Sequence, residues 1–433
     1  MKIKELSNKK IAILWFGKEG RSTLRFLKNN NFLDVTILDQ NLDLDSDTGD
    51  ILAISWELYL ENLNEFDVII KSVWISPYQH QELQNFKWKL TTATEIFFSN
   101  YNWKVIGISW TKGKSTTSSL CHHVLSGLGF KTALIWNIWT PALDYIGENY
   151  DFVVYELSSY MLENFSPSLY VWVLINIFVD HLDWYNWSFE RYKTSKENIF
   201  KNAKKKIINY SLASKIHDPD IIYYNKRDRD INFHEGSYYM WESPIFNHHW
   251  IHLEWEHNME NITCVLTILH EIWIDIHDVK KILTNFCALP HRLEDVGIYN
   301  DIRFINDAIS TTPESTIEAI KTYKEQVWTI FLWGTDRWYD FWELVKYLEK
   351  YNIKNIVLFP ESSEKIKKHL NNSFNITETT LMREGVNFAF KNTKPGEISL
   401  LSTASPSYSL WKNFEQQWEE FKKFIKEYKN KEQ

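Results

Sequence analysis

The stretch that most constrains this chain is an apolar segment that runs through a glycine–lysine–serine turn. Residues 104–109 (KVIGIS) predict a buried strand, and residues 115–129 predict a helix directly after Gly113-Lys114. In such a unit, backbone amides and the helix N-terminus bind phosphate, the lysine reaches the outer phosphates and the Ser115 hydroxyl holds Mg²⁺. The strict pattern has glycine at position 108, where this chain has isoleucine. The sequence therefore predicts a variant P-loop, and a chance match before a helix is the alternative.

Strands and helices alternate along the rest of the chain, which predicts parallel sheets with helices on their faces. Strand patterns recur in three series that begin near residues 10, 104 and 303, and the weakly periodic stretch 212–250 fits a small antiparallel excursion. A chain of 433 residues is long enough for three domains. We expect an α/β protein with a Rossmann-like domain at 1–92, a central P-loop ATPase-type domain with a mostly parallel sheet at 93–288, and a second Rossmann-like domain at 289–433.

Charge and cysteine content argue against several classes of protein. The 48 Lys plus Arg against 56 Asp plus Glu give a net charge of −8, whereas a general nucleic-acid binder has a basic excess. The basic run at 204–206 is interpreted as a solvated face. Cys121, Cys264 and Cys287 lack metal-site spacing and fit a disulfide-free protein of a reducing compartment. No segment approaches the roughly 20 apolar residues of a membrane span, so we expect a cytoplasmic protein with no nucleic-acid partner and no membrane insertion.

Polar residues follow several of the predicted strands. Glu156 ends the apolar run 152–156, His181 follows the next run, and Lys196 lies on the helix predicted after it. In open α/β sheets, ligands bind at the carboxyl ends of the strands, and Mg²⁺ takes oxygen ligands there. Taken alone, His181 is interpreted as structural and Lys196 as a solvated helix residue. Beside the P-loop, Glu156 and His181 predict a metal-assisted phosphate site.

Three polar residues of the C-terminal third lie next to apolar runs. Arg292, Asp307 and Arg337 are each interpreted, when taken alone, as surface or loop residues. A guanidinium in a turn, as predicted for Arg337, can hold a carboxylate through two hydrogen bonds. Spacing by itself leaves that role open.

Seven motifs together resemble the Mur ligase family over essentially the whole chain. They are the P-loop, ELSSY (156–160), NIFVDHLDWY (176–185), HN..N (257–261), LPHRLE (289–294), NDAISTTPEST (306–316) and LLSTASPSYSLWKNFEQ (400–416). The last two resemble the D-glutamate-adding member rather than the members that add alanine, a diamino acid or a dipeptide. The resemblance implies an ATP-dependent carbon–nitrogen ligase of peptidoglycan synthesis, and so a part in cell wall biogenesis, cell shape and division.

The resemblance also implies the reaction. ATP phosphorylates the carboxylate of UDP-N-acetylmuramoyl-L-alanine, and the amine of D-glutamate displaces phosphate from the resulting acyl phosphate, which leaves ADP and phosphate. Positioning and charge neutralisation supply most of the catalysis in such a transfer. These small molecules are the expected partners, and the protein is expected to be a monomer. The resemblance implies Mg²⁺ as the metal, with two ions bound.

Site residues are assigned by the same resemblance. The catalytic group is Lys114, Glu156, His181 and Lys196, and the metal ligands are Ser115, Glu156, His181 and Lys196 in its carbamylated form. The ATP contacts are Lys112, Gly113, Lys114, Ser115, Thr116, Asn258, Asn261, Arg292 and Asp307. Asp39, Ser72 and Asn137 hold the UDP substrate, and Arg337, Ser407 and Phe414 receive D-glutamate. Arg337 and Ile309 both stand where some members of the family have lysine.

Tryptophan is unusually frequent and glycine unusually rare. The chain has 21 Trp and 13 Gly, against a usual glycine share of about 7%. Trp110 lies inside the phosphate-binding loop, where small residues let the backbone approach the ligand. Tryptophans at family glycine positions are Trp15, Trp74, Trp110, Trp136, Trp139, Trp255, Trp333, Trp338 and Trp418. Our hypothesis is that many of these residues are glycine in the living protein, encoded by UGA, whereas Trp184 is genuine.

Two other interpretations stay open at this point. If the tryptophans are real, the P-loop is distorted or filled, and the chain is a catalytically defective relative that acts as a binding or scaffold protein. An aromatic-rich nucleic-acid binder is the third class, but stacking grooves need a basic track that a net charge of −8 does not favour.

Overall fold

The computed structural model forms two compact units, Met1–Cys287 and Ala288–Gln433. The residues it describes are 1–40, 51–55, 59–101, 103–109, 113–135, 140–163, 165, 167–176, 182–214, 216, 218–226, 230–251, 256–277, 279–286, 293–310, 312–334, 339–405, 410–411 and 414–429. None of the helices within these ranges is long and apolar enough to cross a membrane.

The first sheet has five parallel strands in the order β3-β2-β1-β4-β5. The strands are β1 (Ile11–Leu14), β2 (Val35–Asp39), β3 (Leu52–Ser55), β4 (Val68–Lys71) and β5 (Leu90–Thr91), accompanied by α1 (Lys18–Asn29), α2 (Gln81–Gln84), α3 (Ala93–Ser99), η1 (Ile3–Leu6), η3 (Leu63–Glu65) and η4 (Lys87–Lys89). Strand order reverses between β1 and β4, both of which are completely buried. In open sheets this reversal marks the crevice where ligands bind.

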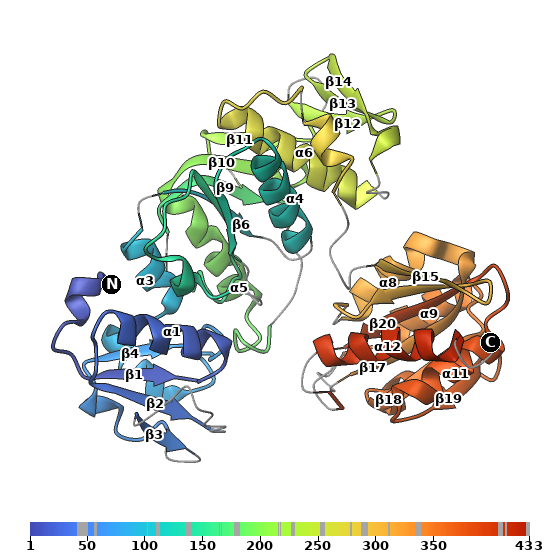
Figure 1. The fold of residues 1–433 in the computed structure, drawn as a ribbon, viewed down its shortest axis with the longest axis horizontal. Helices are drawn as coiled ribbons and strands as arrows, with labels where there is room; N and C mark the ends of the chain where they lie inside the picture. Colours follow the sequence, from blue (N-terminus) through green and yellow to red (C-terminus); the bar gives the residue numbers. More distant parts are fainter. Residues whose placement is uncertain are drawn as a thin grey trace. The chain divides into compact units, whose positions relative to one another are not determined.

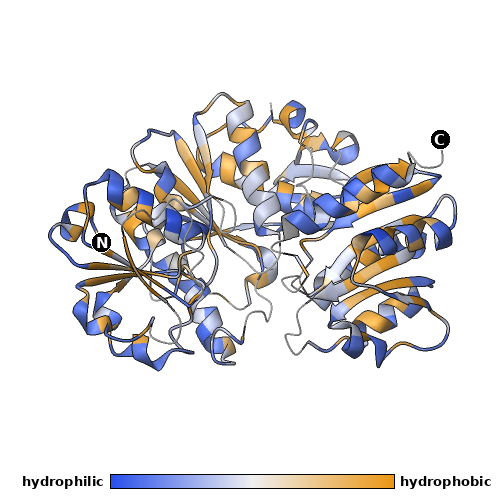
Figure 2. Cartoon of the chain, turned by 60° about the horizontal axis from the view of Figure 1, so that its bottom comes forward, coloured by the Kyte–Doolittle hydropathy of each residue, from blue (hydrophilic) through white to orange (hydrophobic). Residues whose placement is uncertain are grey.

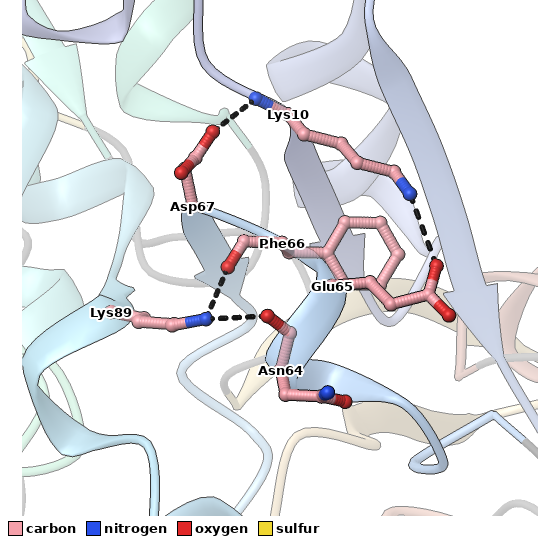
Figure 3. A network of polar contacts seen from close by, with 6 residues as sticks. All are labelled: Lys10, Asn64, Glu65, Phe66, Asp67 and Lys89. Carbon is pink, nitrogen blue, oxygen red and sulfur yellow. Dashed lines mark hydrogen bonds and ion pairs between the residues drawn. The ribbon is translucent and has the colours of Figure 1, made fainter.

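Lysines fix the amino ends of these strands, at the opposite edge from that crevice (Figure 3). The Lys10 backbone N–H donates to Asp67 at 2.9 Å, and its Nζ lies 3.1 Å from Glu65. Lys89 Nζ donates to the carbonyl of Phe66 at 2.6 Å. Because the side chains of the Lys10–Glu65 ion pair are 38% and 55% exposed, the pair contributes about 0–1 kcal/mol, and we assign these contacts a structural role.

The central sheet is also parallel, in the order β11-β10-β9-β6-β8-β7. Its strands are β6 (Lys104–Ser109), β7 (Thr132–Ile135), β8 (Phe152–Glu156), β9 (Leu169–Leu174), β10 (Ala203–Asn209) and β11 (Ile221–Tyr224). Helices α4 (Lys114–Gly127) and α6 (Glu256–Glu271) lie side by side over one face (Figure 1). The strands read as continuous apolar runs because helices cover both faces of a parallel sheet.

A three-stranded antiparallel sheet, β12-β13-β14, follows the central strands. It lies within the stretch where an antiparallel excursion was expected. Its strands are β12 (Ile231–His234), β13 (Ser237–Met240) and β14 (Ser243–Asn247), and the other elements of this part are α5 (Phe189–Glu197), α7 (Lys280–Leu283), η5 (Ala142–Tyr145), η6 (Asn198–Asn202), η7 (Tyr210–Leu212) and η8 (His248–Trp250).

The second unit holds one sheet in the order β15-β16-β20-β17-β18-β19, with only β15 antiparallel to its neighbour. The elements are β15 (Glu294–Tyr299), β16 (Ile302–Asp307), β17 (Val327–Gly334), β18 (Asn355–Glu361), β19 (Asn375–Glu378), β20 (Ile398–Ala404), α8 (Pro313–Tyr323), α9 (Trp342–Lys350), α10 (Ser363–Lys367), α11 (Met382–Asn392), α12 (Phe414–Lys429) and η9 (Lys324–Gln326). Helices α11 and α12 pack together and bury Val386, Phe421 and Ile425 against the sheet.

Apolar residues concentrate on the strands of each sheet, whereas the outer faces of the helices are hydrophilic (Figure 2). This distribution is the expected one for helices that cover a parallel sheet. The predicted α/β class with several parallel sheets is confirmed. The division into three domains at residues 92 and 288 stays a prediction.

Candidate active site

The predicted P-loop lies at the carboxyl end of β6, where α4 begins. Gly113 is the N-cap of α4 and has φ 95°, a left-handed conformation that glycine adopts without steric penalty. Lys114, Ser115 and Thr116 form the first turn, whose amide N–H groups have no carbonyl partner within the helix. The positive end of the helix dipole also lies here. This turn is therefore built to bind an anion such as phosphate.

Four buried hydroxyls near this turn lack a hydrogen-bond partner within the described ranges. They are Ser109 Oγ, at the end of β6, and Thr117 Oγ1, Ser118 Oγ and Ser119 Oγ, in α4. An unsatisfied buried hydroxyl costs about 1–3 kcal/mol, so such groups are normally paired by a ligand, by water or by a neighbouring segment. Their position fits a site that binds a polar ligand.

Glu156 ends β8 at the same edge of the central sheet. It lies opposite Ile108 of β6, and only 4% of its surface is exposed. Among the residues that the structure describes, none donates a hydrogen bond to its carboxylate or forms an ion pair with it. Because a buried carboxylate needs a compensating charge, and Mg²⁺ is bound through carboxylate oxygens, Glu156 fits the predicted metal ligand. The described part of the chain contains no group of three or more His, Cys, Asp or Glu that could hold a metal, and it does not include His181.

Lys196 lies on α5 and is 2% exposed. Its Nζ is 5.0 Å from the centroid of the Tyr192 ring. Burial of an ammonium group is costly, so the interpretation of Lys196 as a solvated helix residue is wrong. The reason is the position of α5, which turns this face of the helix toward the core.

A hydrogen-bond network that the sequence did not reveal holds α5 in place. Ser195, the residue before Lys196, donates its hydroxyl to one oxygen of Glu163, and Tyr78 donates to the other. Tyr78 comes from the loop after β4, so the network connects the first sheet to the helix that carries Lys196. Burial raises the pKa of Tyr78, and the hydrogen bond to Glu163 raises it further.

Replacing Tyr78 by phenylalanine is expected to lower the free energy of unfolding by about 1.5–3 kcal/mol, because a hydrogen bond to a charged partner is lost. Urea unfolding followed by circular dichroism measures the change. Tyr170→Phe is the matched control, since the Tyr170 ring contacts Lys104 but its hydroxyl makes no hydrogen bond to any described residue. A Tyr78→Phe loss no larger than that of the control would contradict the assignment.

Two of the predicted contacts to the UDP substrate lie at the crevice of the first sheet. Asp39, the last residue of β2, accepts a hydrogen bond from the backbone N–H of Phe16 at 2.5 Å. Ser72, directly after β4, donates its hydroxyl to Glu19 Oε2 at 2.8 Å. Both side chains thus hold the turn between β1 and α1, and they flank the point where strand order reverses.

Glu19 and Lys71 are two opposite charges in this crevice that sequence analysis missed. Lys71 Nζ donates to the carbonyl of Ile75 at 3.0 Å, while the Glu19 carboxylate accepts from Ser72 and, at 3.4 Å, from the N–H of Val73. Burial lowers the pKa of Lys71 to about 8, against the opposing attraction of Glu19. Burial likewise raises the pKa of Glu19. The sequence feature that could have pointed to this site is a lysine at the end of an otherwise apolar strand.

Predicted nucleotide contacts occur in both units. Asn258 and Asn261 lie in the first turns of α6, and Asn261 Nδ2 donates to Asn258 Oδ1 at 3.2 Å. In the second unit, the Asp307 carboxylate ends β16 and accepts hydrogen bonds from Ser310, at 2.5 Å, and Ser402, at 2.8 Å. Asp307 is therefore buried rather than a surface or loop residue, because it ties two adjacent strands together.

Several predicted residues are not placed. Phe414 opens α12, but its side chain is not described. The remaining predicted site residues outside the described ranges are Lys112, Asn137, His181, Arg292, Arg337 and Ser407.

Comparison with known proteins shows which family the chain resembles. The model of the Mur ligase middle domain matches residues 108–269, the segment that carries the P-loop, Glu156 and Lys196. The UDP-N-acetylmuramoylalanine–D-glutamate ligase of Francisella tularensis subsp. novicida is 29% identical over 432 residues, which cover 98% of this chain and 97% of the relative. The relative of the same name from Francisella philomiragia is 29% identical over 434 residues, 98% of each chain. Residues 108–269 therefore carry a Mur ligase middle domain, and the chain is similar to Mur ligases over nearly its whole length.

Solved structures show the same fold at lower sequence identity. The UDP-N-acetylmuramate–alanine ligase of Thermotoga maritima superposes with a TM-score of 0.58 at 17% identity, over 95% of this chain and 99% of that one. The D-alanyl-D-alanyl-adding ligase of Acinetobacter baumannii gives a TM-score of 0.62 at 15% identity, over 95% of this chain and 90% of that one. The predicted family, the α/β fold and the enzyme class, an ATP-dependent ligase, are confirmed.

Proposed function

We propose that this Mur ligase adds D-glutamate to UDP-N-acetylmuramoyl-L-alanine in peptidoglycan precursor synthesis. The observation that carries the proposal is the match, over nearly the full length of both chains, to relatives named as D-glutamate ligases. The motifs at 306–316 and 400–416, which resemble the D-glutamate-adding member, support the same acceptor.

The first turn of α4 would bind the phosphates of ATP. Lys114 and the backbone amides at the N-terminus of α4 would neutralise and orient the outer phosphates of ATP, next to the carboxylate that attacks them. Transfer of the γ-phosphoryl group gives an acyl phosphate and ADP. The amine of D-glutamate, in its uncharged form, then attacks the carbonyl carbon, and the C–O bond to phosphate breaks as the amide forms.

The chain's own residues fit a hard cation beside these phosphates. Glu156 is buried without a described partner, and Ser115, His181 and carbamylated Lys196 would complete the set with it. When bound, Mg²⁺ supplies charge neutralisation of the transferring phosphoryl group. Carbamylation turns the amine of Lys196 into a carboxylate-like oxygen ligand, which fits its 2% exposure better than a buried cation does.

The remaining substrate contacts are assigned to the residues that the family resemblance implies. We assign the UDP end of the substrate to Asp39, Ser72 and Asn137, at the first sheet. Nucleotide contacts go to Lys112, Asn258, Asn261, Arg292 and Asp307, and D-glutamate contacts to Arg337, Ser407 and Phe414. The three predicted domains, 1–92, 93–288 and 289–433, would carry these roles in a cytoplasmic monomer.

A phosphate-release assay tests the acceptor. With ATP, Mg²⁺ and UDP-N-acetylmuramoyl-L-alanine, D-glutamate is expected to support turnover at least about 10²-fold faster than L-alanine or diaminopimelate, because a site built for a second carboxylate leaves buried polar groups unpaired with other acceptors. The assay compares the chain as written with a version that has glycine at the suspect tryptophans. Faster turnover with either competitor would contradict the proposal.

The competing function is a binding or scaffold protein derived from a ligase. The observation that favours it is Trp110, a large side chain in the phosphate-binding loop. Its expected result differs: the protein purified from its source cells releases no phosphate with any acceptor. Turnover by that protein would exclude it, whereas turnover that appears only in the glycine version would assign the defect to the tryptophans.

A further inference from the structure

Four tryptophans have a backbone conformation that suits glycine. The φ angles are 76° at Trp15, 60° at Trp187, 57° at Trp241 and 65° at Trp273. For a bulky L-residue a positive φ is an outlier, because Cβ approaches the carbonyl oxygen. Packing does not compensate, since these side chains are 48%, 67%, 57% and 85% exposed.

Trp273 occupies the position after α6 that usually belongs to glycine. Its N–H donates to the carbonyl of His270 at 3.0 Å, and the next N–H, that of Ile274, donates to Leu269 at 2.9 Å. This pair of bonds defines a Schellman motif, whose left-handed residue is most often glycine. Helix α4 ends in the same motif, and there the equivalent residue is Gly129, with φ 91°.

Trp241 begins a two-residue hairpin between β13 and β14. Met240 pairs with Ser243, so only Trp241 and one further residue form the turn. A two-residue hairpin with positive φ at its first residue is the type that has glycine there. The neighbouring hairpin of the same sheet, between β12 and β13, also needs a positive φ in its turn, and there Gly236 has φ 75°.

The backbone conformations at residues 187 and 15 also favour glycine. Asn186 and Trp187 have consecutive φ angles of 50° and 60°, the combination for which Asn-Gly is preferred. Trp15 opens the turn between β1 and α1, which also contains Gly17. A Cβ on Gly20, in the first turn of α1, would lie 2.5 Å from the Trp15 carbonyl oxygen, so the backbone at residue 15 packs closely against the helix.

We propose that the living protein carries glycine at residues 15, 187, 241 and 273, and that the exposed rings there are not a docking surface. Family resemblance pointed to only the first of these. Trp172 and Trp184 are tryptophan in the living protein: Trp172 is completely buried in β9, and Trp184 is buried and donates its Nε1–H to the Trp74 carbonyl at 3.2 Å. This inference does not depend on which acceptor the ligase uses.

Peptide mass spectrometry of the protein purified from its source cells tests the assignment directly. Glycine is expected in the peptides that contain residues 15, 187, 241 and 273, and tryptophan in those that contain residues 172 and 184. Tryptophan at the four turn positions would overturn the proposal, and so would glycine at residue 172 or 184.

Thermal unfolding of the chain as written gives an independent test. Trp241→Gly and Trp273→Gly are each expected to raise the midpoint by about 2–4 °C, because the strain at positive φ is relieved. Trp88→Gly is the matched control: Trp88 is 76% exposed on η4, outside the positive-φ set, so glycine relieves no strain there. A midpoint that does not rise above that of the control in either turn variant would overturn the proposal.

Discussion

Replacing Lys114 by methionine is expected to lower ATP-dependent phosphate release by about 10²–10³-fold, the usual effect of removing one charge-stabilising group. Lys114 is the first residue of α4 and directly follows the left-handed Gly113, so its side chain starts from the turn that would hold the phosphates. The methionine variant keeps most of the length of the side chain and removes its charge and its hydrogen-bond donors. The rate is measured with saturating D-glutamate in the version with glycine at the suspect tryptophans, so that Trp110 does not mask the effect.

Lys131→Met is the matched control for this experiment. Lys131 precedes β7, at the opposite edge of the central sheet, and its Nζ lies 5.2 Å from the Tyr150 ring. Loss of that charge is expected to change the rate by less than about twofold, because exposed charges contribute little. Similar rates for the two variants would contradict the assignment of Lys114 to the phosphates.

Sequence patterns located the edges of the sheets where the site residues lie. Asp39 and Glu156 were placed at strand ends because an apolar run of strand length stops at each of them, and the structure ends β2 and β8 at these residues. Gly113 was recognisable because a glycine between a strand and a helix has a specific backbone role. Local patterns of this kind carry information over a few residues only.

Contacts between distant segments could not be derived in this way. The bond from Ser402 to Asp307 joins residues 95 positions apart, and it exists because β16 and β20 are neighbours in the sheet. Likewise, Tyr78 reaches Glu163 only because the loop after β4 lies against the elements that surround α5. Strand order sets these pairs, and no local pattern in this sequence encodes strand order. The left-handed turns at Trp187, Trp241 and Trp273 were hidden for a different reason, since tryptophan gives no turn signal.

The free energy of unfolding is expected to rise as the pH increases from about 8 to about 10.5, because of Lys71. Burial holds the folded pKa of Lys71 at about 8, below the ordinary value of 10.5. Below pH 8 both states keep the proton, and the cost of burying the cation is complete. Between the two pKa values the unfolded chain still binds a proton that the folded chain has released, so rising pH favours the folded state. The full effect is about 3 kcal/mol.

Comparison with a double variant isolates this effect from tyrosine titration. Lys71→Met combined with Glu19→Gln removes both charges, so that neither is left in the crevice without the opposite one. Urea unfolding at pH 7.5, 8.5 and 9.5 is expected to show the wild-type chain gaining stability over the double variant as the pH rises. Lys10→Met, which removes one side of the exposed Lys10–Glu65 pair, is the control and should show no such trend. The Glu19 carboxyl acts in the other direction and in a lower window: its raised pKa means that stability falls as the pH rises from its ordinary value of 4.5 through the folded value. A stability difference between wild type and double variant that stays flat above pH 8 would show that Lys71 reaches solvent in the folded chain.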